Sequence, residues 1–477
     1  MEVKIRKFEY KDINNKIQWI NNPLNNAYLH YDLPLEYEKT VNWYNNNRDN
    51  NKRLDCVIEA DGKPVGLIGL LSIDNNRKDA EYYISMGEVE YKGKGISYKA
   101  SNLLLSYAFN NLSLENIYLY TEIDNIPAQR LFKKLGFTLI EKKEKDIKIN
   151  DKYIDRYFYS ISKFSCFLRS NHTPITNIGI VNDNRLFVKR EDLIPYSFGG
   201  NKARKAAKFF EIIDAMKKDY IITYGSSHSN HCRIIANLAA YRNIPCLIIS
   251  PEEKQTNTNN KIMMKLFGAD IITVPVEEVS KTIDKELKKL EGKGFNPYFI
   301  PGGGHSNLGT EAYIDCYNEI KKYEEKNDME FDYIFLASGT GTTQAGLVCG
   351  QILNNDHKKI IGISIARVNP RGRNIVLKSV KEYLPEIDES LISQNTIFLD
   401  EYIISGYSSK NREIEDIVRE MIRNYGIPLD CTYTGKAYLG MNKYLNSNNI
   451  RNKNILFIHT GGTPLFFDDL NNIGDYE

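Results

Sequence analysis

The 477-residue sequence lacks the paired cysteines that build zinc ribbons and disulfide frameworks. Its seven cysteines are scattered along the chain without a single C-x-x-C pair. In a chain of this length, that spacing argues against structural disulfides and against a thiolate zinc site. We therefore expect reduced thiols in a cytoplasmic protein.

Long apolar runs and a charge excess of either sign are also missing. No stretch approaches the roughly 18 apolar residues of a membrane span, and the opening MEVKIRKFEYKD carries no apolar segment of the signal-peptide kind. With 63 Lys and Arg against 61 Asp and Glu, the net charge of +2 gives no electrostatic reason to expect nucleic acid or a membrane as partner. Small soluble ligands are the better hypothesis.

The chain is too long for one ordinary core, so two or three domains are expected. Residues 54–87 contain short apolar runs separated by turns, one of them an Asp-Gly pair, which predicts an antiparallel meander. A helix-period stretch, the strand NIYLYTEI and the helix PAQRLFKKLG follow. The first part of the chain is therefore predicted to be a mixed α+β domain.

Beyond residue 175, predicted strands and helices alternate strictly. The helices are predicted at 201–218, 230–242, 257–267, 279–290, 309–324 and 343–353. Helices of this length between apolar strands require parallel pairing with both sheet faces covered, which is a doubly wound α/β architecture. We predict a first domain at 1–163, a linker at 164–178 and a second domain at 179–477.

The segment GGNKARK (199–205) places Lys202 at the predicted start of a helix. A lysine at the positive end of a helix dipole gains nothing for stability, and burial there would lower its pKa. A neutral amine is what Schiff-base chemistry requires. The two glycines before it let the backbone approach a ligand closely. The alternative is an ordinary solvated lysine at a helix start.

A second candidate site lies in LASGTGTTQAGLV (336–348), an apolar strand, a Gly/Thr loop and an apolar helix. Backbone N–H groups and threonine hydroxyls at such a helix start can bind a phosphate. The loop has neither the Walker lysine nor the dinucleotide-binding glycine spacing. A simple strand-to-helix turn is the alternative.

The segment GSSHSNHCR (225–233) also lies between an apolar strand and a helix. Ser229 and Asn230 can serve as the helix cap, which is the purely structural interpretation. His228 and His231 have no carboxylate or third ligand at useful spacing, so no metal site is predicted.

Taken in order, five segments of the second half resemble the fold-type-II pyridoxal-phosphate (PLP) enzymes. The resemblance is to the branch with D-cysteine desulfhydrase and aminocyclopropane-carboxylate (ACC) deaminase. The five are VKREDLIPYSFGGNKARK, GSSHSNHCR, SGTGTTQAGLV, LDCTYTGKA and FIHTGG, and they span about residues 180–467. The resemblance implies an α/β fold of two parallel-sheet subdomains with flanking helices, and a homodimer.

The resemblance also implies a role for each matched residue. Lys202 would hold PLP as an internal aldimine and then act as the base near the substrate Cα. The cofactor would further be bound by Ser338, Gly339, Thr340, Gly341, Thr342 and Thr343 at the phosphate, by Asn230 at the ring and by Thr460 at the pyridine nitrogen. Ser229 and His231 would face the substrate carboxylate, and Tyr407 and Tyr433 would flank the reacting carbon.

Two positions separate the nearest branches of this family. ACC deaminases carry Glu and Leu where this sequence has Thr434 and Thr460, and both threonines resemble the desulfhydrase side. The resemblance therefore implies that Thr434 binds the substrate. His228 and His305 depart from the family's usual residues, and His228 is a further candidate for substrate binding.

In the first half, EYKGKG (90–95) is by itself a weak phosphate-loop signal. Together with DNIPAQRLFKKLGF (124–137) it resembles the GNAT acetyltransferases, and this resemblance covers about residues 1–160. It implies that Lys92, Gly93, Lys94 and Gly95 bind the pyrophosphate of acetyl-CoA and that Asn125 lies near the pantetheine arm. Glu90 and Phe132 depart from the family pattern, and Phe132 replaces a tyrosine that often protonates the departing thiolate. Tyr91 or a water could supply that proton.

These resemblances predict a bifunctional enzyme: a PLP-dependent lyase that eliminates from a small amino acid, joined to an acetyl-CoA-dependent N-acetyltransferase. The lyase would yield a 2-oxo acid and ammonia. Two alternatives remain open. The second half could catalyse β-replacement, or the first half could be a non-catalytic acyl-CoA sensor that regulates the lyase.

Overall fold

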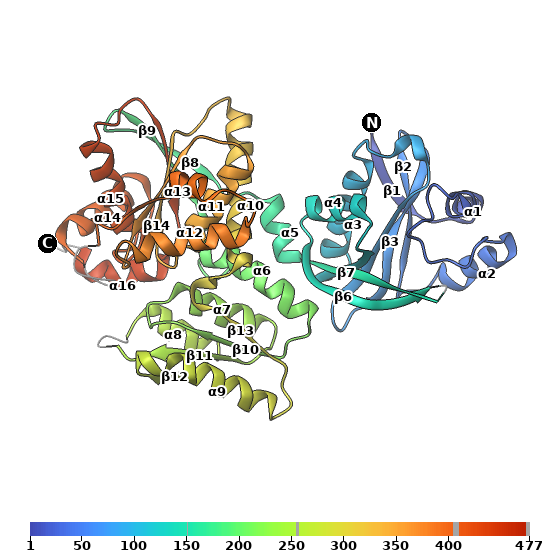
Figure 1. The fold of residues 1–477 in the computed structure, drawn as a ribbon, viewed down its shortest axis with the longest axis horizontal. Coiled ribbons are helices and arrows are strands. Elements are labelled where there is room, and N and C mark those ends of the chain that lie inside the picture. The colour runs from blue at the N-terminus through green and yellow to red at the C-terminus, as the bar shows by residue number, and fades with distance from the viewer. Residues whose placement is uncertain (150, 254–256, 404–409, 474–477) are drawn as a thin grey trace. The chain divides into compact units, whose positions relative to one another are not determined.

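The computed structural model describes residues 1–149, 151–253, 257–403 and 410–473 (Figure 1). Its chain divides into two compact units, one of residues 1–169 with 211–216 and one of 170–210 with 217–477. The predicted linker contains most of helix α5 (Lys163–Ser170) and the start of strand β8 (Ile175–Val181). Within the described ranges, no helix has the length and apolar character needed to cross a membrane.

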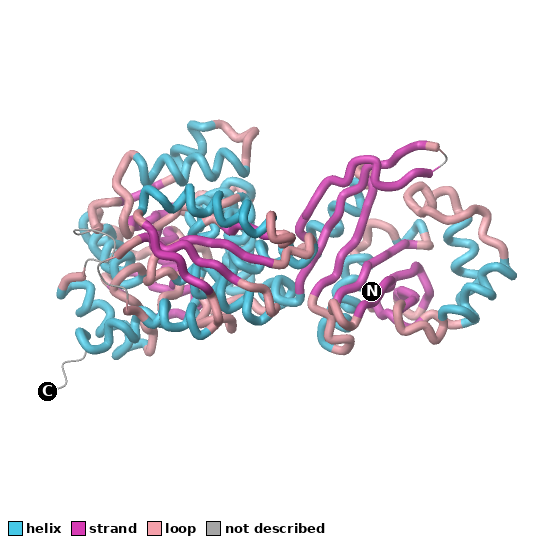
Figure 2. Tube along the Cα trace, turned by 90° about the horizontal axis from the view of Figure 1, so that it is seen from below, coloured by secondary structure: helices cyan, strands magenta, loops and turns pink. Residues whose placement is uncertain are grey.

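The first unit is built on a seven-stranded sheet, and strands are drawn in magenta in Figure 2. The strands are β1 (Val3–Lys7), β2 (Leu54–Ala60), β3 (Lys63–Asp74), β4 (Asp79–Met86), β5 (Asn116–Glu122), β6 (Thr138–Ile149) and β7 (Lys152–Ser162). Their order is β1-β2-β3-β4-β5-β7-β6. The predicted meander is β2 to β4, whereas the long pair β6 and β7 was not predicted. Residues 141–146 of β6 are all charged, so that strand has no apolar signal.

Among the described strands of this sheet, β4 and β5 form the one parallel pair. Its register covers only Asp79–Glu81 against Asn116–Tyr118. Beyond these residues the two strands no longer pair, so their backbone groups are available to a ligand. This is where the unit's larger cavity lies.

The helices of the first unit cover this sheet. They are α1 (Ile13–Asn21), α2 (Tyr37–Asn47), α3 (Ile96–Asn110), α4 (Ile126–Leu135) and α5, with 3-10 turns at Tyr10–Asp12 and Val89–Tyr91. Leu104 and Ala108 of α3 are fully buried in one apolar cluster with Ile58, Ile68 and Ile117 of the sheet. The helical spacing of these apolar residues explains why α3 forms and which face it buries.

The second unit contains two sheets, which confirms the predicted pair of parallel-sheet subdomains. The six-stranded sheet has the order β16-β15-β14-β17-β9-β8 and is parallel except for β8 against β9. The four-stranded sheet, β12-β11-β10-β13, is parallel throughout. Besides β8, the strands are β9 (Asn184–Arg190), β10 (Tyr220–Tyr224), β11 (Cys246–Pro251), β12 (Asp270–Val274), β13 (Pro297–Ile300), β14 (Tyr333–Ser338), β15 (Lys359–Ser364), β16 (Ile397–Leu399) and β17 (Asn454–His459).

Both faces of the six-stranded sheet are buried. Ile334 and Leu336 of β14 belong to one apolar cluster, and Phe335 and Ala337 of the same strand belong to another. Successive residues of a strand point to opposite faces, so the two clusters lie on the two sides of the sheet. This is the arrangement that uninterrupted apolar strands predict.

Helices flank both sheets of the second unit (Figure 1). They are α6 (Asn201–Ala215), α7 (Asn230–Tyr241), α8 (Asn259–Leu266), α9 (Val279–Glu291), α10 (Asn307–Asn327), α11 (Thr342–Leu353), α12 (Arg371–Tyr383), α13 (Glu389–Asn395), α14 (Arg412–Tyr425), α15 (Thr434–Ser447) and α16 (Thr463–Ile473), with 3-10 turns at Glu191–Leu193, Val276–Glu278 and Gly302–Gly304. The six helices that the sequence predicted are α6 to α11.

Candidate active sites

A cavity of about 300 Å³ lies in the second unit, at the carboxyl ends of parallel strands. Segments that follow β10, β13, β14, β15 and β17 line it, together with the start of α6 and Tyr433. Ligands of open α/β sheets bind at this edge. Among the residues predicted from the sequence, the cavity brings together Lys202, Ser229, Asn230, His231, Ser338, Gly339, Thr340, Gly341, Thr343, Tyr433 and Thr460.

Lys202 is the second residue of α6, and two glycines with positive φ lead into the helix. The Asn201 N–H donates to the Thr460 carbonyl at 3.0 Å, which joins the helix start to the loop after β17. A side chain on Gly200 would lie 2.8 Å from that carbonyl, so the close approach requires glycine. Burial, followed by the positive charge of Arg367, lowers the pKa of Lys202 to about 8.

A second lysine on α6, Lys205, was not singled out from the sequence. Its side chain is 1% exposed and its Nζ donates to the Gly303 carbonyl at 3.4 Å. Burial and the neighbouring Lys202 lower the pKa of Lys205 well below the usual lysine value. Two buried amines this close cannot both hold a proton easily, which favours a neutral amine in the site.

A buried ion cluster anchors α6. Arg204 donates to Glu191 at 2.7 Å and to Glu319 at 2.6 Å, and Lys189 pairs with Glu319 at 2.9 Å. Although burial alone would raise it, the charges of Arg204 and Lys189 lower the pKa of Glu191 to about 2. Because Arg204 lies two residues after Lys202, the cluster fixes the helix turn that carries the candidate lysine.

The Gly/Thr loop joins β14 to α11, as the sequence predicted. The Oγ1 atom of Thr340 lines the cavity region, is buried, and has no hydrogen-bond partner among the described residues. Thr343 accepts from the Asn201 amide at 3.0 Å, and the guanidinium of Arg367 donates to the Gly339 carbonyl at 2.7 Å. A buried hydroxyl without a partner costs free energy unless a ligand satisfies it.

The histidine-containing segment caps α7. Ser229 is the N-cap, and its hydroxyl accepts from the Cys232 N–H at 3.1 Å. The Thr223 hydroxyl donates to the Ile300 carbonyl at 2.8 Å and lies 3.0 Å from His231 Nε2. His231 Nε2–H therefore donates to Thr223, and its Nδ1 is an acceptor. Burial lowers the pKa of His231 well below the usual value, so the ring is neutral.

The loop after β17 is fixed by its own histidine. Gly461 N–H donates to His459 Nδ1 at 3.2 Å, and His459 Nε2 lies 2.9 Å from the Pro428 carbonyl. Burial lowers the pKa of His459, which keeps this neutral tautomer. The hydrogen bonds hold Thr460, which lines the cavity, in place.

Three of the residues predicted for this site do not line the cavity, and a fourth lies outside the described residues. His228 Nδ1 lies 3.1 Å from Ser227 Oγ. Thr342 Oγ1 lies 2.7 Å from His305 Nδ1, and this hydrogen bond supports the end of the Gly/Thr loop. The Thr434 hydroxyl donates to buried Asp430 at 2.8 Å. Tyr407 falls in 404–409, outside the described part of the chain.

The charge of the cavity suits an anionic ligand. Its described lining contains the basic residues Lys202 and Arg367 but neither Asp nor Glu. The unsatisfied Thr340 hydroxyl and the N–H groups at the starts of α7 and α11 add donors. These residues fit PLP, since they offer an amine for its aldehyde and donors for its phosphate. The sequence did not identify three residues that surround the candidate lysine: Lys205, Arg367 and Asn201.

The first unit has a cavity of about 940 Å³ where β4 and β5 separate. Lys92, Gly93, Gly95 and Asn125 line it, whereas Lys94 does not. Gly95 adopts φ 77° at the N-cap of α3, a left-handed conformation that glycine favours, so the N–H groups of the first turn are accessible. Asn125 caps α4 by accepting from the Ala128 N–H at 3.3 Å.

The same cavity holds the residues that could act on a substrate amine. Phe132 and Tyr91 line it, as do Glu81 and Glu122. His30 Nε2 lies 3.4 Å from Glu122. Burial raises the pKa of Glu81. Phe132 has no phenol hydroxyl, but Tyr91, Glu81 and Glu122 line the same cavity and can exchange protons.

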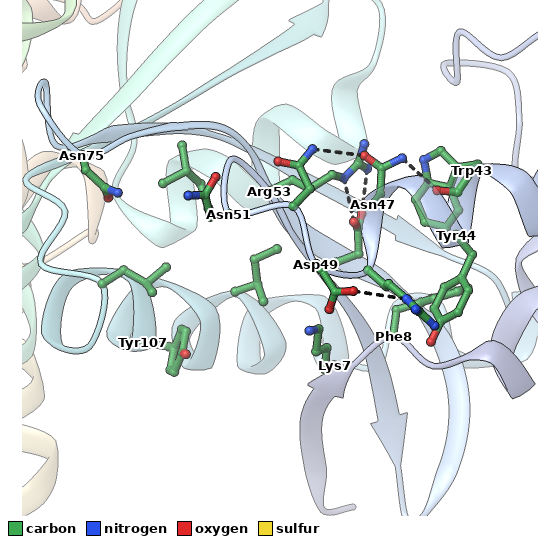
Figure 3. Close-up of a pocket in the computed structure, with 16 residues that line it drawn as sticks. Lys7, Phe8, Trp43, Tyr44, Asn47, Asp49, Asn51, Arg53, Asn75 and Tyr107 are labelled. Carbon is green, nitrogen blue, oxygen red and sulfur yellow. Dashed lines mark hydrogen bonds and ion pairs between the residues drawn. The ribbon is translucent and has the colours of Figure 1, made fainter.

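Another hollow of the first unit, about 450 Å³, contains none of the predicted site residues (Figure 3). Trp43, Tyr44 and Arg53 line it. Arg53 pairs with Asp55 at 2.7 Å and also lines the larger cavity, so the two hollows share one wall.

Comparison with known families agrees with this geometry. The pyridoxal-phosphate dependent enzyme family matches residues 170–461, and the acetyltransferase (GNAT) domain family matches residues 2–138. The first range contains the cavity with Lys202, and the second contains every residue that lines the larger cavity of the first unit except Arg156.

Individual relatives cover the second half almost completely. D-cysteine desulfhydrase of Yersinia enterocolitica is 29% identical over 63% of this chain and 94% of the relative. The enzyme of the same name from Yersinia pestis is 30% identical over the same shares. The crystal structure of an ACC deaminase homologue is 28% identical, has a TM-score of 0.57, and covers 63% of this chain and 92% of its own. Spermidine N-acetyltransferase from Vibrio cholerae, with CoA and spermine, is 26% identical over 35% of this chain and 98% of its own, with a TM-score of 0.33.

The structure and the comparisons lead to the same assignment. The chain belongs to the pyridoxal-phosphate dependent enzyme family, with a domain of the D-cysteine desulfhydrase and ACC deaminase type that follows a GNAT acetyltransferase domain.

Proposed function

We propose that the second half is a lyase that eliminates a β-substituent from a small amino acid of the D-cysteine type, giving a 2-oxo acid and ammonia. The observation that carries this proposal is the cavity that joins Lys202, Ser229, Tyr433 and Thr460 from distant parts of the sequence. The name of the Yersinia relatives supports D-cysteine as the first substrate to test.

Each cavity residue has a separate role in the proposed reaction. PLP, when bound, supplies an electron sink for the pair released at the substrate Cα. Lys202, with its lowered pKa, takes the proton from Cα as a neutral amine. The substrate carboxylate binds at the start of α7, where Ser229 and the helix N–H groups offer donors.

The leaving group departs from Cβ with the electron pair of the broken bond. Tyr433 lines the cavity, which supports a role for it near the reacting carbon. Loss of hydrogen sulfide from D-cysteine, followed by uptake of one water, yields pyruvate and ammonia. Thr460 would offer a hydroxyl to the pyridine nitrogen of the cofactor, and the described lining has no carboxylate that would keep that nitrogen charged. Prompt elimination is therefore favoured over transamination.

The direct test supplies PLP and D-cysteine to the purified protein and measures sulfide, pyruvate and ammonia together. Equal amounts of the three products support elimination. Absence of all three with D-cysteine and with other small amino acids carrying a β leaving group would refute it. Adding a second thiol nucleophile separates the alternative, because β-replacement would consume that thiol and release no pyruvate.

For the first half we propose acetyl transfer from acetyl-CoA to an amine. The accessible helix start at Gly95 and the gap between β4 and β5 support it. Release of free CoA with a panel of amines tests the proposal. The sensor alternative, motivated by Glu90 and Phe132, predicts acyl-CoA binding without transfer. The homodimeric state and cytoplasmic location belong to the same proposal, and sedimentation of the purified protein tests the first of them.

A further inference from the structure

Asp430 is a fully buried carboxylate at the turn that presents Tyr433. Its Oδ1 accepts from the Thr432 N–H at 2.9 Å and from the Tyr433 N–H at 2.7 Å. Its Oδ2 accepts from the Thr434 hydroxyl at 2.8 Å and from the Thr434 N–H at 3.3 Å. One side chain thus organises the backbone on both sides of Tyr433 at the start of α15.

The same carboxylate packs against the loop that carries Thr460. A Cβ on Gly462 would lie 2.1 Å from Asp430 Oδ2, and Gly462 has φ 102°. No other residue fits there without moving the carboxylate. Asp430 therefore lies between the two segments that bring Tyr433 and Thr460 to the cavity, although Asp430 does not line the cavity itself.

We propose that Asp430 is a positioning residue whose ionised carboxylate holds Tyr433 in the lyase site, so that protonation of Asp430 sets the acidic limit of the reaction. This inference depends on the proposed elimination and on a role for Tyr433 in it. It assigns to Asp430 no contact with the substrate or cofactor.

The surroundings of Asp430 make its charge sensitive to pH. Burial and the charge of Asp469 together raise the pKa of Asp430 to about 6, against the opposing effect of the Thr434 hydroxyl and the backbone N–H groups. Asp469 on α16 accepts from the Cys431 N–H at 2.8 Å and pairs with Lys410. Among the described residues, Lys436 on α15 and the Cys431 thiol are further titratable neighbours of Asp430. Asp430 is thus ionised at neutral pH and becomes protonated as the pH falls through about 6.

Protonation changes the geometry of the turn. The Asp430 N–H donates to Thr434 Oγ1 at 2.8 Å, so the hydroxyl proton of Thr434 points toward Asp430 Oδ2. A proton on Oδ2 makes that atom a donor and displaces the hydroxyl proton. The N–H groups of Thr432 and Tyr433 then face a neutral oxygen, and hydrogen bonds to a neutral acceptor are weaker than those to a carboxylate. Tyr433 is held less firmly.

Asp430→Asn is the sharpest test, because the amide resembles the protonated acid in shape and does not titrate. We expect wild-type kcat for D-cysteine to fall below about pH 6, with KM little changed. In Asp430→Asn we expect kcat to be reduced about tenfold or more at neutral pH and the acidic inflection to disappear. The visible absorbance of the lysine-bound cofactor should be retained, which shows that PLP still binds.

Asp469→Asn is the matched control. It removes a nearby buried carboxylate whose charge raises the pKa of Asp430, and it leaves the contacts of Asp430 with Tyr433 in place. The inflection should remain and move to lower pH. An inflection that persists unchanged in Asp430→Asn would overturn the proposal, and so would one that Asp469→Asn leaves unmoved or raises.

A second readout needs neither cofactor nor turnover. Because the folded pKa of Asp430 lies above its unfolded value near 3.9, ionisation of Asp430 removes stability as the pH rises from about 4 to about 6. Urea midpoints of wild type should fall over this range relative to Asp430→Asn. Parallel profiles would overturn the titration of Asp430. If the wild type eliminates from no amino acid, the proposed function and the positioning role fail, whereas the urea comparison still decides the titration.

Discussion

Burial and one cationic neighbour, rather than a general base, lower the pKa of Lys202. Arg367 approaches from the segment after β15, and its positive charge makes a proton on Lys202 less favourable. Lys205 on the same helix acts in the opposite direction, through a side-chain hydrogen bond with Lys202. The amine is therefore prepared for attack on an aldehyde without help from a carboxylate.

The substitution Arg367→Gln tests this electrostatic effect. Removing the guanidinium should raise the pKa of Lys202, because its charge is the second cause of the lowering. The rate at which the apoprotein attaches PLP should then reach its plateau at a higher pH than in wild type. Stopped-flow absorbance at several pH values measures it.

Arg367→Lys keeps the positive charge and is the matched control for the Gly339 contact. Its pH profile should remain close to wild type. If Gln and Lys variants shift equally, the guanidinium acts through the loop rather than through its charge.

The sequence predicted residues that line the cavity better than it predicted the residues that hold them in place. Lys202 and the Gly/Thr loop carry local signals, a lysine after glycines and a strand-to-helix turn. Lys205, Arg367 and Asp430 do not, because their importance arises only from burial and from partners far away in the chain. Asp430, for example, acts through Gly462, more than thirty positions later.

At the scale of elements, three helix starts form the lyase cavity: those of α6, α7 and α11. The sequence predicts their first residues at 201, 230 and 343, and they begin at Asn201, Asn230 and Thr342. Glycine, serine and threonine before an apolar helical pattern are strong signals. The pairing of β6 with β7, and the short strand β16, have no such signal, since charged or very short strands show no apolar periodicity.

The approach of two loops should make Gly461→Ala severe. A Cβ at this position would lie 2.7 Å from the backbone Cα of Gly200, which is two residues before Lys202. We expect loss of PLP binding and a destabilisation on the order of 3 kcal/mol, from the clash together with positive-φ strain. Titration with PLP and urea denaturation measure the two effects.

Gly426→Ala separates strain from clash. Gly426 also has positive φ, 64°, but a Cβ there meets nothing within 4 Å. It should cost about 1 kcal/mol and leave PLP binding intact. Equal losses in the two variants would show that the loop contact is unimportant.

The ion cluster beneath α6 gives another prediction. Arg204→Met leaves the buried carboxylates of Glu191 and Glu319 without their main partner, and breaking a buried pair in this way costs about 3–5 kcal/mol. The exposed pair of Lys378 and Glu382 is the control, and Lys378→Met should change stability by less than about 0.5 kcal/mol. Urea denaturation compares them. Similar losses would mean that the cluster does not anchor the helix.

At the scale of the whole molecule, the two candidate sites lie in separate compact units, each with its own core. The change in pattern over roughly residues 160–175 predicts a boundary there, and the two compact units separate at 169 and 170, with 211–216 grouped with the first unit. The division of the second unit into two sheets was implied only by the family resemblance, because alternating strands and helices suit one sheet as well as two.

Separate sites predict separate losses. Lys202→Ala should abolish elimination and the visible absorbance while leaving CoA release with an amine acceptor unchanged. Gly95→Val, which forces a β-branched residue into φ 77° at the start of α3, should do the reverse. Parallel assays of both variants check this. Loss of both activities in one folded variant would contradict independent sites.

The central claim is that Lys202 holds PLP in a site built for elimination. The most direct measurement is the absorption spectrum of the purified protein between about 300 and 500 nm, before and after D-cysteine, with pyruvate assayed in the same sample. We predict a visible band that is absent in Lys202→Ala, changes on adding substrate, and is accompanied by pyruvate. A protein that shows no band after incubation with PLP, or a band that no small amino acid alters, would contradict the account.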